Sequence, residues 1–143
     1  MELKVKKLRP GAQLPHRATA SSTGLDLFAC IDYDKTVTLD STPRLIGTGI
    51  AIEVPPGYDA QIRPRSSLSL KGIGVTFGTV DSDYRGEVMV TMYMLAPGVS
   101  FEIRNGDRIA QLVIHKLANV KIIEAEELSI TERGTGGHGS TGR

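Results

Sequence analysis

Residues 78–95 read GTVDSDYRGEVMVTMYML, a polar block bounded by glycines and followed by a run rich in β-branched residues. Acids, a tyrosine and glycines between two strand-like runs predict a β-hairpin at residues 78–87. Turns often carry Asp and Gly for backbone reasons alone, but this connection holds more charged and aromatic groups than a turn requires. The stretch therefore indicates a strand-rich fold with a functional connection in it.

Similar runs and turns continue on both sides of this block. Strand-like runs lie at residues 45–54, 58–63, 87–95 and 108–117. Turn sequences separate them: DSTP at 40–43, PPG at 55–57, APG at 96–98 and RNGD at 104–107. The 16 glycines, 7 prolines and absence of tryptophan fit many tight turns around an aliphatic core. The pattern predicts an all-β sandwich, jelly roll or barrel.

The length and charge of the chain limit its function. Its 143 residues predict one domain, and a formal net charge of +1 from mixed residues gives no basic face for coating a polyanion. No nucleic-acid partner is therefore expected. Residues 1–8 do not resemble an export signal, and no run of about 18 apolar residues occurs, so no membrane span is expected either.

The metal-binding residue types are sparse. Cys30 is the only cysteine, which excludes a disulfide framework and a cysteine-rich zinc site and favours a reducing, cytoplasmic location. His16, His115 and His138 lie far apart without metal-ligand spacing. A zinc ion held by the protein is therefore not expected.

Two shorter polar clusters precede the block at residue 78. Asp26 lies between apolar neighbours at the start of a strand-like run, where an acid serves either as a turn residue or in a site. Residues 63–67 read RPRSS, in which Arg65 offers a planar fork of donors and the hydroxyls of Ser66 and Ser67 open a short predicted helix at 66–71. This chemistry suits phosphate oxygens, although an exposed turn with a solvated arginine gives the same pattern.

Residues 133–143 read RGTGGHGSTGR. Their five glycines and lack of large apolar side chains predict a flexible arm after a β core at 1–132. Arg133, Ser140 and Thr141 in this arm can donate to phosphate. The arm lacks the P-loop pattern, and a Gly-x-Gly-x-x-Gly turn needs a βαβ unit that this strand-rich chain does not offer.

Five blocks in order carry a family resemblance over essentially the whole chain: ASSTGLDL at 20–27, PRSS at 64–67, GTVDSDYRGE at 78–87, GDRIAQLV at 106–113 and RGTGGHGSTG at 133–142. They resemble the motifs of the trimeric dUTPase family. The resemblance implies a jelly-roll-like, distorted β-barrel or sandwich subunit with one short helix and a flexible arm. It also implies a homotrimer whose sites are shared. One chain would give the Asp26, Arg65 and Gln111 motifs, a second the hairpin at 78–87 and a third the arm.

The implied activity is hydrolysis of dUTP to dUMP and diphosphate, which limits uracil incorporation into DNA and supplies dUMP for dTMP synthesis. Asp81 resembles the catalytic carboxylate that activates water against the α-phosphorus. Mg²⁺ would be held mainly by the triphosphate, with Asp26 reaching it through water. The implied substrate-binding residues are Arg65, Ser66, Ser67, Gly78, Thr79, Val80, Tyr84, Met89, Gln111, Arg133, His138, Gly139, Ser140 and Thr141.

Two features depart from the commoner family pattern, and both concern recognition of the base. His138 stands where the family usually has the phenylalanine that stacks on uracil, and imidazole offers a smaller face. Residues 72–77 look shorter than the usual form and lack an asparagine before the block at 78. Recognition of uracil is therefore expected to depend more on main-chain groups around Gly78 and Met89.

Two alternatives stay open. A dCTP deaminase-like enzyme would share the fold and the Arg-Ser-Ser block, but it needs a glutamate where this chain has Thr91. A non-catalytic nucleotide-binding regulator could keep the same fold. The joint presence of Asp81, Tyr84 and Arg133 argues against it.

Overall fold

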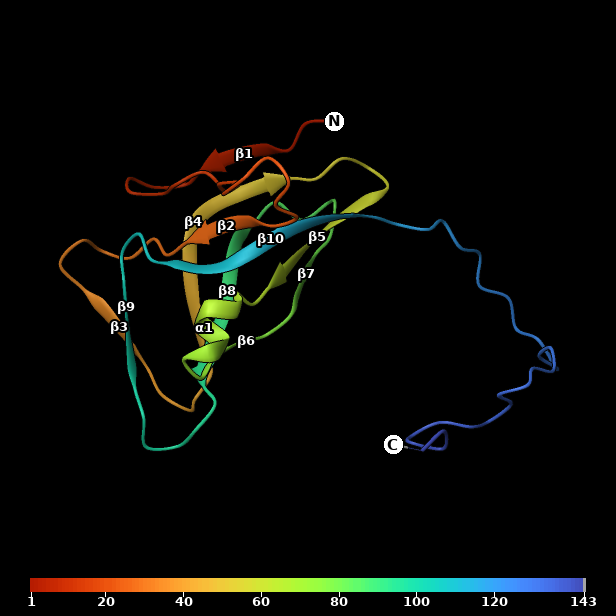
Figure 1. Ribbon diagram of the computed structural model, residues 1–143. Coiled ribbons are helices and arrows are strands. Elements are labelled where there is room, and N and C mark those ends of the chain that lie inside the picture. Colours follow the sequence, from red (N-terminus) through yellow and green to blue (C-terminus); the bar gives the residue numbers. More distant parts are fainter. Residues whose placement is uncertain (143) are drawn as a thin grey trace.

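A computed structural model describes residues 1–142, and their body consists of two four-stranded sheets and one two-stranded sheet, all antiparallel (Figure 1). The first sheet has the order β1 (Lys4–Lys7), β4 (Arg44–Glu53), β8 (Glu87–Met94) and β6 (Ile73–Val75). The second has the order β2 (Leu25–Phe28), β10 (Arg108–Lys116), β5 (Tyr58–Arg63) and β7 (Gly78–Val80). β3 (Thr36–Leu39) pairs with β9 (Phe101–Arg104) beside them.

The hydrophobic core lies between the two larger sheets. Alternate residues of β8 are buried, as expected for a strand with one face inward. They pack in one cluster with aliphatic side chains of the opposite sheet: Leu27, Ala60, Ile62, Ile109 and Leu112. The all-β prediction is confirmed, and each of the four long predicted strands is found within one residue of its expected ends.

The β4–β8 ladder contains a bulge close to the start of β8. Gly47 pairs with Met89, but the next aligned pair is Ala51 with Glu87, so β4 has extra residues between them. Gly49 in this bulge has a φ of +68°, which a residue with a Cβ rarely adopts. Bulges bend a strand and often lie next to active sites.

The predicted β-hairpin at residues 78–87 is wrong. β7 pairs with β5 in one sheet, and β8 pairs with β4 and β6 in the other. Residues 81–86 therefore pass from one sheet to the other, and we call them the inter-sheet loop. Local sequence could not show this, because both strands find better partners far away in the chain.

The short helix α1 (Ser66–Leu70) confirms the predicted helix, but not its cap. Arg65 occupies the N-cap position with extended backbone, and no side chain caps the helix. Ser66 and Ser67 are already inside the first turn, so their hydroxyls lie past the capping position. Within residues 1–142, no helix is long and apolar enough to span a membrane.

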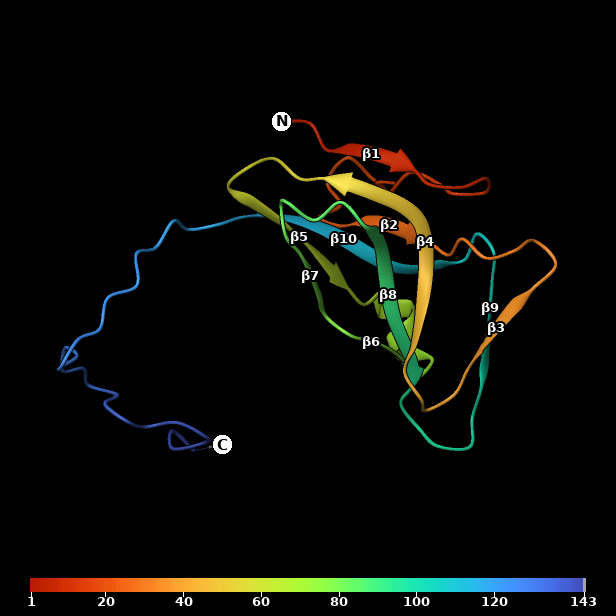
Figure 2. The same cartoon turned by 180° about the vertical axis from the view of Figure 1, so that it is seen from behind.

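The segment after β10 leaves the body. Residues 117–142 contain no strand, and every one of these residues is exposed except the half-buried Gly136. Both views show this segment extending away from the sheets (Figure 1, Figure 2). The expected boundary between core and arm at residue 132 stays a prediction. Arg143, the last residue of the expected arm, lies outside the described residues.

Candidate functional site

A pocket of about 230 Å³ opens where β7 and β8 diverge into their separate sheets. Its walls come from β5, β7, the inter-sheet loop and the start of β8: Ile62, Gly78, Thr79, Val80, Asp81, Tyr84, Glu87, Val88 and Met89. Ligand pockets for drug-sized molecules usually measure about 300–1,000 Å³. This pocket suits a smaller group, such as a single-ring base.

The backbone gives this pocket polar edges. β7 is the outermost strand of its sheet, so half of its N–H and C=O groups point away from β5. In residues 1–142, β6 pairs with β8 only at Met92–Met94, so the first half of β8 has no ladder partner on that side. Two strand edges with free donors and acceptors therefore face the pocket.

Tyr84 closes one side of the pocket. Its hydroxyl donates to the carbonyl oxygen of Glu87 at 3.0 Å, which folds the ring back over the loop. A Cβ on Gly86 would lie 2.3 Å from the Tyr84 hydroxyl oxygen and 2.5 Å from its Cζ. Only glycine at residue 86 allows the ring to lie this close to the backbone. Asp81, at the other end of the loop, is exposed at the pocket rim.

A second group of polar residues gathers where β2, β10 and α1 meet. Asp26 Oδ1 lies 3.0 Å from Arg65 Nε, and its Oδ2 lies 3.4 Å from Arg108 Nη1. Arg65 Nη1 also donates to the Arg108 carbonyl at 3.3 Å. The Asp26 side chain is 12% exposed and the Arg108 side chain 55% exposed. The acid thus holds two guanidinium groups in place, and their outer donors stay open to an anion.

Gln111 joins this cluster through the strand register. It pairs with Asp26 across the β2–β10 ladder, and its Nε2 donates to the Pro64 carbonyl at 2.9 Å. A Cβ on Gly24 would lie 2.0 Å from Gln111 Oε1, so glycine there makes room for the amide. The structure therefore brings Asp26, Arg65 and Gln111 together, as the sequence predicts.

The end of the arm folds into successive turns. Gly136 N donates to the Arg133 carbonyl at 3.0 Å, and Ser140 N donates to the Gly137 carbonyl at 3.1 Å. These turns place Arg133, Ser140 and Thr141 around one hollow of about 400 Å³. His138 lies in the same turns with a φ of +50°.

The three groups share no lining residue within one chain. The inter-sheet pocket, the Asp26 cluster and the arm hollow are lined by separate residues. The sequence did not single out Arg108, although it lies in the GDRIAQLV block. Its position in the same block as Gln111 was the signal that could have identified Arg108 as a site residue. The contact of Arg108 with Asp26 became visible only with the strand register.

The donors present do not form a protein cage for a metal ion. No group of three or more His, Cys, Asp or Glu side chains gathers anywhere in residues 1–142. Both oxygens of Asp26 already face arginines, and each carboxylate oxygen can accept more than one hydrogen bond. Asp26 therefore fits contact with the water shell of an ion that a ligand carries, which is how Mg²⁺ is often bound.

Comparison with known structures identifies the fold class. The chain superposes with a TM-score of 0.90 and 27% identity on a variant dUTPase of Staphylococcus bacteriophage 80alpha bound to dUpNHpp, covering 99% of both chains. A dUTPase from phage phi11 of S. aureus, whose structure concerns a structural Mg(II) ion, matches at 24% identity with a TM-score of 0.79. It covers 89% of this chain and 98% of that one. The fold is the jelly-roll-like β architecture of these proteins.

Sequence comparison is more specific. The chain belongs to the dUTPase family, whose pattern matches residues 11–142. The deoxyuridine 5'-triphosphate nucleotidohydrolase of Hydrogenobaculum sp. (strain Y04AAS1) is 52% identical over 99% of both chains. That of Nautilia profundicola is 48% identical over the full length of both. The family resemblance is therefore confirmed, and the chain is a hydrolase.

Proposed function

We propose that this protein hydrolyses dUTP to dUMP and diphosphate by attack of water on the α-phosphorus. The observation that carries the proposal is the pocket between β7 and β8, which has Asp81 and Tyr84 at its rim in a chain of the dUTPase family. Asp81 would orient the water and take its proton. A positioned base of this kind typically contributes about 10²–10⁴-fold.

Uracil would enter between the edges of β7 and β8. The free backbone groups of Gly78, Thr79 and Val80 on one side and of Met89 on the other would pair with the polar edge of the base. Glycine at residue 78 keeps this wall free of a side chain, because a Cβ there would lie 3.2 Å from Ile62. Close contact between the strand edges and the base would then reject the extra methyl group of thymine.

Tyr84 would lie against the deoxyribose. Its ring is fixed by the hydrogen bond to the Glu87 carbonyl and by contact with Gly86. A fixed aromatic face in contact with C2′ leaves no space for a hydroxyl. The same ring would therefore exclude UTP by steric contact.

The triphosphate would contact the Asp26 cluster and the arm. Arg65, Ser66, Ser67 and Gln111 would hold phosphate oxygens, and Arg108 adds a guanidinium to the same place. From the arm, Arg133, Gly139, Ser140 and Thr141 would close on the γ-phosphate, and His138 would stack on the base. The shared hollow of Arg133, Ser140 and Thr141 supports this grouping.

Mg²⁺ fits the Asp26 cluster through its water shell. When bound to the triphosphate, such an ion neutralises phosphate charge and polarises the oxygens around the reacting phosphorus. Asp26 would orient the water shell, and Arg65 and Arg108 would keep its carboxylate in place.

The protein would act as a homotrimer. The pocket, the Asp26 cluster and the arm hollow have separate linings in one chain, so three copies can complete one site between them. A mobile arm that closes over bound substrate would exclude water and finish the site.

The test is diphosphate release with Mg²⁺ from dUTP, measured beside dCTP, dTTP and UTP. Rapid release from dUTP alone is expected, and chelation of the ion should suppress it. A protein that binds dUTP tightly but releases no diphosphate would be a regulator instead. Deamination of dCTP would favour the deaminase-like alternative.

A further inference from the structure

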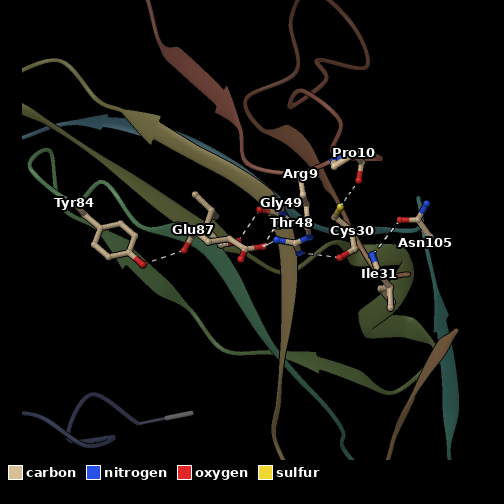
Figure 3. A network of polar contacts seen from close by, with 10 residues as sticks. Arg9, Pro10, Cys30, Ile31, Thr48, Gly49, Tyr84, Glu87 and Asn105 are labelled. Carbon is tan, nitrogen blue, oxygen red and sulfur yellow. Dashed lines mark hydrogen bonds and ion pairs between the residues drawn. The ribbon is translucent and has the colours of Figure 1, made fainter. Parts of the chain in front are cut away.

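An ion pair links the N-terminal segment to the first residue of β8, directly after the inter-sheet loop (Figure 3). Arg9 Nη1 lies 2.8 Å from Glu87 Oε1, and Arg9 Nη2 donates to the carbonyl of Cys30 at 2.9 Å. The same Glu87 oxygen accepts the backbone N–H of Gly49 at 2.7 Å. One carboxylate therefore connects the N-terminal segment, the bulge of β4 and the start of β8.

The surrounding backbone is shaped to admit this pair. A Cβ on Gly47 would lie 2.6 Å from Glu87 Oε1 and 2.7 Å from Arg9 Nη2. A Cβ on Gly49 would lie 2.8 Å from Cys30 Sγ. The bulge thus supplies both the space for the two charged side chains and the N–H that Glu87 accepts.

Glu87 also connects the pair to the pocket. Its side chain turns towards the bulge, while its carbonyl oxygen accepts the hydroxyl of Tyr84 at 3.0 Å (Figure 3). Thr48 holds the next residue of β8, because its hydroxyl donates to the Val88 carbonyl at 2.6 Å. The acceptor of the Tyr84 hydrogen bond is therefore anchored at the bulge.

The pair is more sheltered than a typical surface ion pair. Its side chains are 40% and 24% exposed, compared with 71% and 47% for Lys4 and Glu53. Burial lowers the pKa of Arg9, but its contacts with Glu87 and, to a smaller extent, Cys30 together hold this pKa above its ordinary value. Charge-assisted bonds of this kind are about twice as strong as neutral ones.

We infer that the Arg9–Glu87 pair positions Tyr84, so that the pocket keeps the width that accepts a 2′-deoxyribose and rejects a 2′-hydroxyl. The inference rests on the proposed function, because that proposal gives Tyr84 its place against the sugar. Arg9 and Glu87 act through Tyr84 and the loop, and so they are positioning residues. Without the pair, Glu87 keeps its bond to the Gly49 N–H but loses its contact with Arg9, so the start of β8 is held less firmly and the ring can shift.

The experiment compares kcat/KM for dUTP and for UTP in the full-length protein and its variants. A misplacement of about 1 Å can cost on the order of 10²-fold, and the ring keeps its own hydrogen bond, so Arg9→Ala should lower the dUTP-to-UTP preference by about tenfold. Arg9→Lys should lower it less, because an ammonium keeps the charge but not the two-point contact. Glu87→Gln keeps an oxygen that can accept the Gly49 N–H but removes the charge. Its loss of dUTP-to-UTP preference should therefore lie between those of Arg9→Ala and Arg9→Lys.

A matched control separates positioning from general stability. Arg104 pairs with Glu102 at 3.7 Å on β9 and is 72% exposed, so Arg104→Ala should leave the preference unchanged. A purely structural role of Arg9 would lower Tm and reduce both kcat/KM values equally. Tyr84→Ala should lower the preference by itself, and adding Arg9→Ala to it should cause no further loss.

Each outcome decides the inference. If Tyr84→Ala lowers the preference while folded Arg9→Ala and Glu87→Gln stay within about twofold of wild type, the inference is overturned and the proposed function stands. If wild type releases no diphosphate from dUTP, the proposed function fails. Amide hydrogen exchange of residues 81–87 then still decides whether Arg9 holds the loop, since unchanged exchange in Arg9→Ala overturns positioning.

Discussion

Asp81 and Tyr84 share a loop that is held by its own hydrogen bonds. Tyr84 N donates to the Asp81 carbonyl at 3.1 Å, and Arg85 Nη1 donates to the carbonyls of Ser82 and Tyr84 at 2.7 and 3.0 Å. The proposed base and the proposed sugar contact are therefore linked by hydrogen bonds within one loop. A change in the loop should affect turnover and substrate choice together.

At the residue scale, Asp81→Asn tests the base. The amide keeps the size of the side chain but cannot take a proton from water, so turnover should fall by about 10²–10⁴-fold. Affinity for a non-hydrolysable dUTP analogue should change little, because Asp81 is not expected to hold the substrate. Stopped-flow diphosphate release gives the first quantity and titration calorimetry the second.

Asp83→Asn is the matched control, since Asp83 is an exposed acid of the same loop that does not line the pocket. Its turnover should remain close to wild type. Turnover of Asp81→Asn within about threefold of wild type would remove Asp81 from the role of base.

At the element scale, the bulge of β4 makes a clear stability prediction. In Gly49→Ala, the new Cβ would lie 2.8 Å from Cys30 Sγ and 2.9 Å from the Ala12 Cβ, at a φ of +68°. Left-handed backbone costs a residue with a Cβ roughly 1–2 kcal/mol, and overpacking adds about 1–3 kcal/mol. Urea unfolding at fixed protein concentration should show the sum of these costs.

Gly57→Ala provides the comparison. Gly57 has a similar φ of +82°, but a Cβ there would meet nothing within 4 Å. This variant should lose only the backbone cost of roughly 1–2 kcal/mol. Equal losses in the two variants would show that the bulge has room to spare.

The positions of the long strands could be predicted from the sequence, but the pairing of the strands could not. Residues 45–54, 58–63, 87–95 and 108–117 were predictable, because a long alternating pattern is a local property of the sequence. β6 and β7 have only three residues each, too few for a pattern. The hairpin was wrong because strand pairing is non-local: β7 finds β5, and β8 finds β4.

The site was predictable to a similar degree. The sequence placed Asp26, Arg65 and Gln111 in one site through their motifs, and the structure brings them together. The pair of Arg9 and Glu87 could not be predicted, because 78 positions separate them in the sequence and their contact depends on a bulge with no residue pattern of its own. Contacts of this kind follow from register and not from spacing.

At the scale of the whole molecule, the segment after β10 differs from the rest of the chain in exposing most of its large apolar side chains. Its large apolar side chains Val120, Ile122, Ile123, Leu128 and Ile130 are 72%, 91%, 73%, 88% and 100% exposed. Contiguous exposed apolar surface usually marks a contact with another protein chain. A neighbouring subunit of the proposed trimer is the natural cover.

Two truncations test this organisation. Removing residues 133–143 takes away no large apolar side chain, so the protein should stay folded and trimeric while hydrolysis is nearly abolished. Removing residues 117–143 also takes the apolar side chains and should weaken the trimer. Analytical ultracentrifugation and diphosphate release measure the two effects. A shorter truncation that unfolds the protein would show that the arm is structural.

The pocket between β7 and β8 has one more consequence, because its two walls belong to different sheets. Its width is a spacing between sheets, and the interior side chains packed between those sheets set that spacing. Val88 and Ile62 illustrate this, since both are buried in the core and also line the pocket. During evolution, exchanges among interior aliphatic residues that stability alone would tolerate would also alter which base is accepted. Selection for discrimination between bases should therefore limit which substitutions of interior aliphatic residues are retained.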